Sequence, residues 1–109
     1  MILVKITMNV RPEKHQEITQ TLLSMIESTE KEAGCLSYAV SCDIENKNRF
    51  NVLEEWKTRD DLNRYLGSHR FGVLLGIKTL LFEPPDIQIN TVSKSEGMEA
   101  VHAVRDKNG

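Results

Sequence analysis

The chain has 109 residues, of which 39% are hydrophobic and 28% are charged, the balance typical of one soluble globular domain. Lys and Arg total 14 and Asp and Glu total 16, so the formal net charge of −2 argues against nucleic acid or an anionic membrane as a partner. Apolar runs are well short of the roughly 20 residues that span a bilayer, and the N-terminus lacks the pattern of a secretory signal.

The first half of the chain alternates between strand and helix patterns. Apolar side chains at every second position over residues 2–10 predict a strand. Apolar residues spaced three and four apart then predict a helix over 12–33, which Gly34 ends as a left-handed cap. Period two returns over 35–43 and predicts the second strand.

A hairpin and a short helix follow. The polar turn at 45–48 leads into a third predicted strand over 49–57, on which Glu54 and Trp56 share one face. Thr58 then caps a short helix, with Asp61 completing a weak form of the capping box.

The second half of the chain contains one more helix and one more strand. Gly67 ends the short helix, and Ser68 can cap a further helix over 69–82. Consecutive prolines stop that helix, and a fourth strand is predicted over 86–92.

The C-terminal segment 93–109 is interpreted as an extension of a domain that occupies residues 1–92. Residues 93–97 form a small polar linker. Residues 98–105 alternate in polarity, which predicts a fifth strand or an extended arm. Because a free exposed strand is prone to aggregate, we expect this segment to pair with a sheet edge, on a partner subunit if one is present.

The order of elements predicts an α+β fold with a ferredoxin-like split βαβ sheet, given a right-handed crossover. Helices can cover only one face of such a sheet. The other face also carries apolar residues, among them Leu3, Ala39 and Leu53. This excess suggests that the second face packs on a partner subunit, as in a homodimer.

The two cysteines, Cys35 and Cys42, are separated by an odd number of residues on one predicted strand. An odd separation places them on opposite faces, so we expect neither a disulfide between them nor a shared metal. They are interpreted as reduced packing residues of a cytoplasmic protein.

The stretch from Val52 to Phe71 resembles the antibiotic-biosynthesis monooxygenase-like family of the dimeric α+β barrel group. The resemblance rests on Glu-x-Trp at the end of the third strand, the short helix after it and a Ser-x-x-Phe helix start. These positions are Glu54, Trp56, Leu62, Leu66, Ser68 and Phe71.

The resemblance implies a homodimer whose two sheets close into a barrel, with a pocket between each sheet and its helices. Some members oxidise quinols or polyketide-like aromatics with molecular oxygen and use no flavin or metal. Related members bind and degrade haem, and others have no known activity. No cofactor and no metal are therefore expected here.

The sequence departs from the family pattern at three places. Tyr65 stands where many members carry His, and Val52 stands where several oxygenases carry Asn. Residues 73–76 contain no counterpart of the iron-ligating His of the haem degraders. These departures lower both specific activities, and haem binding most.

Eight residues are predicted to form the site. Trp56 is expected to position an aromatic ring, although it is equally suited to be a packing anchor. Proton transfer is assigned to three side chains: Glu54, Tyr65 and His69. Glu54 on an apolar face would be a base near neutral pH, and the competing interpretations are a salt bridge to Arg or Lys and simple exposure at the strand end. The predicted substrate-binding residues are Asn9, Tyr38, Phe71 and Leu75.

The leading functional hypothesis is a cofactor-independent monooxygenase that oxidises a quinol or polyketide-like aromatic. The alternative is a non-catalytic, stress-associated or small-molecule binding module of the same fold, and haem binding ranks third. Fold resemblance alone does not decide between these functions.

Overall fold

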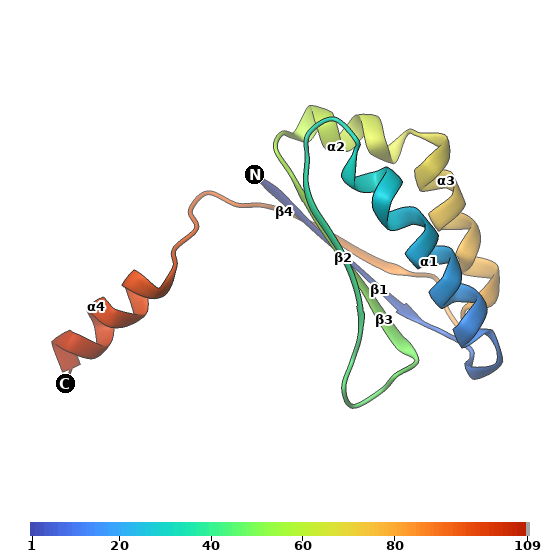
Figure 1. The fold of residues 1–109 in the computed structure, drawn as a ribbon, viewed down its shortest axis with the longest axis horizontal. Coiled ribbons are helices and arrows are strands. Elements are labelled where there is room, and N and C mark those ends of the chain that lie inside the picture. The colour runs from blue at the N-terminus through green and yellow to red at the C-terminus, as the bar shows by residue number, and fades with distance from the viewer. Residues whose placement is uncertain (109) are drawn as a thin grey trace.

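A computed structural model describes residues 1–108, which form an antiparallel sheet with helices against one face (Figure 1). The sheet is four-stranded, in the order β2-β3-β1-β4. In chain order the elements are β1 (Ile2–Asn9), η1 (Pro12–Lys14), α1 (His15–Glu30), β2 (Cys35–Cys42), β3 (Arg49–Trp56), α2 (Arg59–Leu66), α3 (His69–Gly76), η2 (Ile77–Leu80), β4 (Asp86–Thr91) and α4 (Met98–Asn108). This is the predicted α+β ferredoxin-like arrangement.

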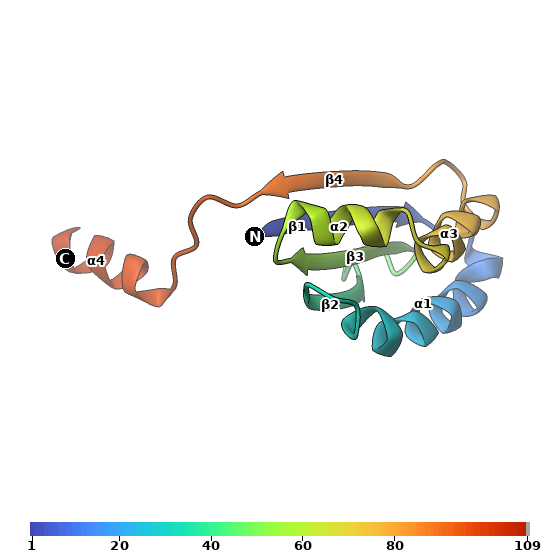
Figure 2. The same ribbon diagram turned by 90° about the horizontal axis from the view of Figure 1, so that it is seen from above.

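The covered face of the sheet carries the core. Helices α1, α2 and α3 lie on one side of the strands, as both ribbon views show (Figures 1 and 2). Alternate residues of β1 and β3 point toward these helices and are buried: Ile2, Val4, Ile6, Met8, Phe50, Val52, Glu54 and Trp56. Strand alternation thus places the acidic Glu54 among apolar neighbours, directly opposite Val4 in the register.

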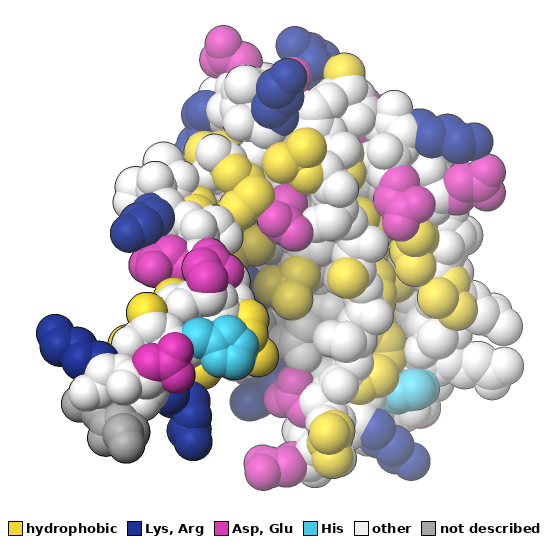
Figure 3. Space-filling model, turned by 60° about the vertical axis from the view of Figure 1, so that its left-hand side comes forward, with side chains coloured by type: hydrophobic (Ala, Val, Ile, Leu, Met, Phe, Trp, Pro, Cys, Tyr) yellow, Lys and Arg dark blue, Asp and Glu magenta, His cyan; other side chains and the backbone are white. Residues whose placement is uncertain are grey.

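The opposite face of the sheet, which we term the outer face, mixes apolar, polar and charged side chains, with Lys5 paired to Leu53 and Glu55 paired to Leu3. Leu53 is 41% exposed there, and Leu3 is half-buried. Ala39 pairs with Leu53 in the register and is also exposed. Figure 3 shows hydrophobic side chains in the middle of the view and most of the charged ones toward its edge.

A β-bulge in β2 overturns the predicted placement of the cysteines. The pairing with β3 shifts between Cys35 and Ser37, so Leu36 has no partner in the register. Cys35 lies opposite Trp56 and Cys42 lies opposite Phe50, which puts both cysteines on the covered face. The prediction of opposite faces was wrong because it assumed a regular strand.

The first helix is shorter than the predicted 12–33. It begins as the 3-10 segment η1 and ends as α1 at Glu30, after which the chain turns. Gly34 closes that turn with a φ of +83°, as a left-handed cap should. A Cβ at this position would also collide with the side chain of Asp61, so glycine is required on two counts.

The predicted helix over 69–82 is likewise shorter. The α-helix ends at Gly76 and continues as the 3-10 segment η2 to Leu80. Leu81 is extended and forms a bridge with Val10, and Phe82 donates a backbone hydrogen bond to Asn9. These contacts with the end of β1 pull the chain out of the helix before the prolines are reached.

The C-terminal segment is the largest departure from prediction, because residues 98–108 form helix α4 and not a fifth strand. Met98 and Val101 lie three residues apart, a spacing that suits a helix as well as the alternation suits a strand. Glu99 accepts a hydrogen bond from the backbone N–H of Gly97 at the start of the helix. Helix α4 stands apart from the sheet and its helices in both ribbon views.

Candidate functional site

The covered face of the sheet contains a buried polar cluster at the end where Trp56 lies. We define the polar cluster as the following five residues, each at most 5% exposed: Thr29, Tyr38, Glu54, Trp56 and Tyr65. They come from α1, β2, β3 and α2, so only the folded chain brings them together.

Two helix caps fix the approach of the aromatic side chains. The Thr58 hydroxyl accepts a hydrogen bond from the Asp61 backbone N–H at 3.1 Å and starts α2, as predicted. The Ser68 hydroxyl accepts one from the Phe71 N–H at 3.2 Å and starts α3. The first cap orients the helix that carries Tyr65, and the second orients the helix that carries Phe71.

Three aromatic rings lie in contact one after another, and we term them the aromatic stack although only one of the two contacts is face to face. The rings of Trp56 and Tyr65 are stacked with centroids 4.8 Å apart and an interplanar angle of 26°. Tyr65 meets Phe71 edge to face at 5.5 Å. Such offset and edge contacts are favoured by the ring quadrupoles and hold the three side chains in one arrangement.

The Glu54 side chain is fully buried and has one hydrogen-bond partner among residues 1–108. Its Oε1 accepts a hydrogen bond from Trp56 Nε1 at 3.0 Å, whereas Oε2 has no partner. Burial raises the pKa of this carboxyl to about 7, and the Trp56 hydrogen bond opposes that rise only in part. The competing interpretation of Glu54 as a salt-bridge residue is not what the structure shows.

The hydroxyl groups around Glu54 are buried without a hydrogen-bond partner. They belong to Thr29, Tyr38 and Tyr65. Burial, followed by the charge of Glu54, raises the pKa of both tyrosines, so both phenols stay protonated near neutral pH and can donate a hydrogen bond. Thr29 was missed by the sequence analysis, although it continues the stripe of Ile18, Leu22 and Met25 on α1.

An apolar cavity of about 130 Å³ lies between β1, β4 and α3. Its lining consists of hydrophobic side chains and a proline: Ile6, Met8, Phe71, Leu74, Leu75, Pro85 and Ile87. Phe71 belongs both to this lining and to the aromatic stack, so the cavity adjoins the polar cluster through one ring.

A groove of about 320 Å³ lies on the other side of the polar cluster. It runs between the end of α1 and the bulged start of β2 and is lined by Glu30, Cys35, Leu36, Ser37 and Tyr38. Burial and the nearby charge of Glu54 raise the pKa of the Cys35 thiol. The bulge is what brings Cys35 to this place, and strand alternation alone could not have found it.

The structure brings six of the eight predicted site residues to this region. Four of them belong to the polar cluster: Tyr38, Glu54, Trp56 and Tyr65. Phe71 and Leu75 line the apolar cavity, with Leu75 at 48% exposure near its mouth.

His69 lies elsewhere. It is exposed at the start of α3 and lines a shallow hollow together with Arg70, which forms an ion pair with Glu32. Its predicted proton-transfer role has no support in this arrangement and stays a prediction.

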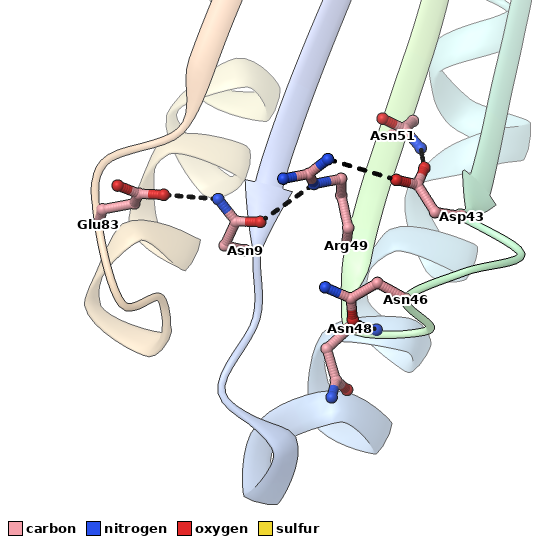
Figure 4. A network of polar contacts seen from close by, with 7 residues as sticks. All are labelled: Asn9, Asp43, Asn46, Asn48, Arg49, Asn51 and Glu83. Carbon is pink, nitrogen blue, oxygen red and sulfur yellow. Dashed lines mark hydrogen bonds and ion pairs between the residues drawn. The ribbon is translucent and has the colours of Figure 1, made fainter.

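Asn9 lies at the opposite end of β1 from the polar cluster. It pairs with Arg49 in the register, whereas Ile2 pairs with Trp56, a separation of roughly 23 Å at 3.3 Å per residue. Asn9 donates to Glu83 at 2.6 Å and accepts from Arg49 at 3.4 Å, within a surface network that continues to Asp43 (Figure 4). Its side chain is thus engaged far from the polar cluster, although its neighbour Met8 lines the apolar cavity.

Metal-binding clusters and membrane-spanning helices are both absent from residues 1–108. Within this range no three His, Cys, Asp or Glu side chains are arranged to hold a metal ion. None of the helices described there is long and apolar enough to cross a membrane.

Comparison with known proteins places the sequence in a family. Residues 1–74 match the family described as antibiotic biosynthesis monooxygenase. A conserved protein from Methanosarcina mazei Go1 is 34% identical, with a TM-score of 0.77 over 82% of this chain and 89% of that one. A Mycobacterium tuberculosis protein shares the fold at 22% identity, with a TM-score of 0.80 over 88% of this chain and 98% of that one.

One curated relative, an uncharacterised protein from Synechocystis, is 27% identical over 96 residues. The match covers 87% of this chain but only 65% of that relative, so the chain spans about two thirds of its length.

Proposed function

Because the chain belongs to the antibiotic biosynthesis monooxygenase family, we propose that it oxidises a small electron-rich phenolic ring with molecular oxygen and without a cofactor. The observation that supports this proposal is the apolar cavity that adjoins the Phe71–Tyr65–Trp56 stack and, through Trp56, the buried carboxyl of Glu54. An engineered cavity of about 150 Å³ binds benzene, so a cavity of this size suits a single ring.

The proposed reaction balances with oxygen as the only oxidant. A phenol with a free para position and O₂ give a quinone and water, with one oxygen atom entering the ring and the other leaving as water. Glu54 takes the phenolic proton, which makes the ring more electron-rich, and Trp56 holds the carboxylate through its N–H. Phe71 and Tyr65 must both move for the substrate to reach Glu54, because their rings lie between the cavity and Trp56.

Oxygen uptake by the metal-stripped protein tests this proposal against a panel of one-ring and fused-ring hydroquinones and phenols. We expect uptake above the autoxidation background, and at least a tenfold loss in Glu54→Gln, which keeps the side-chain shape, and in Trp56→Phe, which keeps an aromatic ring but removes the N–H. Glu27→Gln, on the exposed side of α1, is the matched control and should retain full activity. No uptake from folded protein with any substrate would contradict the proposal.

A second candidate function is the binding of an aromatic molecule without turnover. It is favoured by the lining of the cavity, because every lining side chain is apolar and Glu54 is not among them. Titration calorimetry with phenol and benzene distinguishes the two functions. Binding of both with equal affinity and no oxygen uptake would support the binding module.

We further propose that the protein is a cytoplasmic homodimer, in which residues 1–92 form the domain and 93–109 an arm that contacts the second copy. The outer face supports a partner because Leu3, Ala39 and Leu53 lie on it uncovered by the three helices. Both cysteines are free, in keeping with a reducing compartment.

The position of helix α4 is consistent with the proposed arm. It stands away from the domain, with Met98 64% and Val101 48% exposed. Sedimentation of the full chain should give a dimer, and truncation after Val92 should raise the dimer dissociation constant at least tenfold. A monomeric full chain would contradict the homodimer, and an unchanged dissociation constant would contradict the arm.

A further inference from the structure

Glu54 lies between two spaces of opposite character. On one side is the apolar cavity, whose lining offers no group that can carry a proton. On the other is the groove at the start of β2, lined by Glu30, Cys35, Ser37 and Tyr38 among others. A buried carboxyl that changes its protonation state must exchange its proton with solvent along one of these sides.

The polar atoms that surround Glu54 lie away from the cavity. The titratable and hydrogen-bonding side chains that face it are Cys35 and Tyr38 from β2, Trp56 from β3 and Tyr65 from α2, with Thr29 of α1 beside Tyr65. On β1, Glu54 meets only the apolar Val4 in the register. The acidic Glu30 adds a charge at the groove.

Tyr38 is the one member of the polar cluster that also lines the groove. It lies directly across from Glu54 in the β2–β3 register, on the same face of the sheet. Its hydroxyl is buried without a hydrogen-bond partner, as is Glu54 Oε2, and the Tyr65 side chain also approaches that hydroxyl. Tyr38 is therefore the residue of the polar cluster that lies between the carboxyl and the groove.

We propose that protons reach and leave Glu54 through the groove, with Tyr38 as the positioning residue that relays them, while the apolar cavity serves the ligand alone. In the outward direction, the Glu54 carboxyl gives its proton to the Tyr38 oxygen as the Tyr38 hydroxyl gives its own proton to a water that enters from the groove, because the hydroxyl itself is buried. The products are a carboxylate, an unchanged phenol and a hydronium ion, so charge and protons balance.

This route completes the proposed oxidation, on which its biological use rests, because a base must lose the substrate proton before the next turnover. Separate paths would keep the side from which the ring enters dry while the proton leaves on the other side. The route can be tested without turnover, so its failure and the failure of the oxidation are distinguishable.

The protein carries its own probe for Glu54. Trp56 is the only tryptophan and its N–H donates to the carboxyl, so its fluorescence should follow the ionisation of Glu54. We expect a titration with a midpoint near pH 7 that is absent in Glu54→Gln. A titration that persists in Glu54→Gln would overturn the assignment of this proton to Glu54, and the proposal with it.

The kinetics of this signal test the route. A laser temperature jump in imidazole buffer shifts the pH within microseconds, and the Trp56 signal then relaxes as Glu54 exchanges its proton. We expect Tyr38→Phe to slow this relaxation at least tenfold. Glu54→Gln, which has no carboxyl to titrate, should show no such relaxation. Leu75→Phe, which narrows the cavity without adding a second indole, should leave the rate unchanged.

A second variant tests the route independently of Tyr38. In a Cys42→Ser background, methyl methanethiosulfonate on Cys35 places a small group in the groove and should also slow the relaxation. Circular dichroism confirms that each variant is folded. Relaxation that is unchanged in both groove variants, or slowed only by Leu75→Phe, would overturn the proposal.

Discussion

The apolar cavity and the polar cluster share one layer between sheet and helices, yet they differ in almost every property. The cavity is an empty space with hydrophobic walls from β1, β4 and α3. The polar cluster is filled, and it buries a carboxyl, an indole and three hydroxyls from β2, β3, α1 and α2. Phe71 and Tyr65 meet at the boundary between them.

This difference shows how one core can contribute both binding and chemistry. Apolar side chains that leave a void lose packing contacts but offer a place for a ring. Buried polar groups without partners are costly, and such a cost is tolerated mainly where the groups have a task. The two regions should therefore differ in their response to substitution and to pH.

The largest effect is expected from Trp56→Ala. This change removes the largest side chain of the polar cluster, the stack on Tyr65 and the one hydrogen bond that residues 1–108 donate to the Glu54 carboxyl. We expect a loss of about 3–5 kcal/mol in the free energy of unfolding, measured by urea denaturation. Leu75→Ala, at the half-exposed mouth of the cavity, is the comparison variant. It should lower the free energy of unfolding by less than about 1 kcal/mol, a typical limit for partly exposed positions. Equal losses in both variants would show that the cavity and the polar cluster do not differ in their contribution to stability.

A somewhat smaller effect is expected from pH. The pKa of Glu54 is about 7 in the folded protein against a usual 4.5, so between these values the folded state holds a proton that the unfolded chain has lost. The free energy of unfolding should therefore fall as pH rises through this window, by roughly 3 kcal/mol in total.

Glu54→Gln isolates this contribution, because the amide cannot ionise. The difference in stability between the wild type and this variant should change between pH 4.5 and about 7 and level off above it. A difference that is constant with pH would show that the carboxyl titrates normally.

The smallest effect is expected from Thr29→Val. The Thr29 hydroxyl is fully buried and unpartnered, so replacing it by a methyl group of similar shape should raise the free energy of unfolding by about 1 kcal/mol. Thr19→Val is the matched control on the same helix, because its hydroxyl already donates to the His15 carbonyl at 2.8 Å. Destabilisation by Thr29→Val would mean that the polar cluster is satisfied by groups such as bound water.

Local chemistry made much of the fold predictable. The strand periodicity, the caps at Thr58 and Ser68 and the left-handed Gly34 each depend on residues that are close in the sequence. The Glu-x-Trp spacing likewise puts Glu54 and Trp56 on one face of β3, because side chains two residues apart on a strand point the same way. Six predicted site residues accordingly lie in one region.

Other features depended on contacts between distant segments. The bulge in β2 changes which side chains face the helices, and it brings Cys35 opposite Trp56. The bridge from Leu81 to Val10 shortens the last helix of the domain. Asn9 and His69 are suitable residue types for a site, but their elements carry them away from the polar cluster.

The sequence by itself determined the ferredoxin-like order of elements, because periodicity, capping and turn residues act over a few positions of the chain. Only the tertiary structure decided that Glu54 is desolvated, that Thr29 and Tyr38 surround it, and that the cavity and the groove lie on opposite sides of it. Burial and the pKa of a carboxyl depend on everything packed around the group, and those neighbours come from four separate elements.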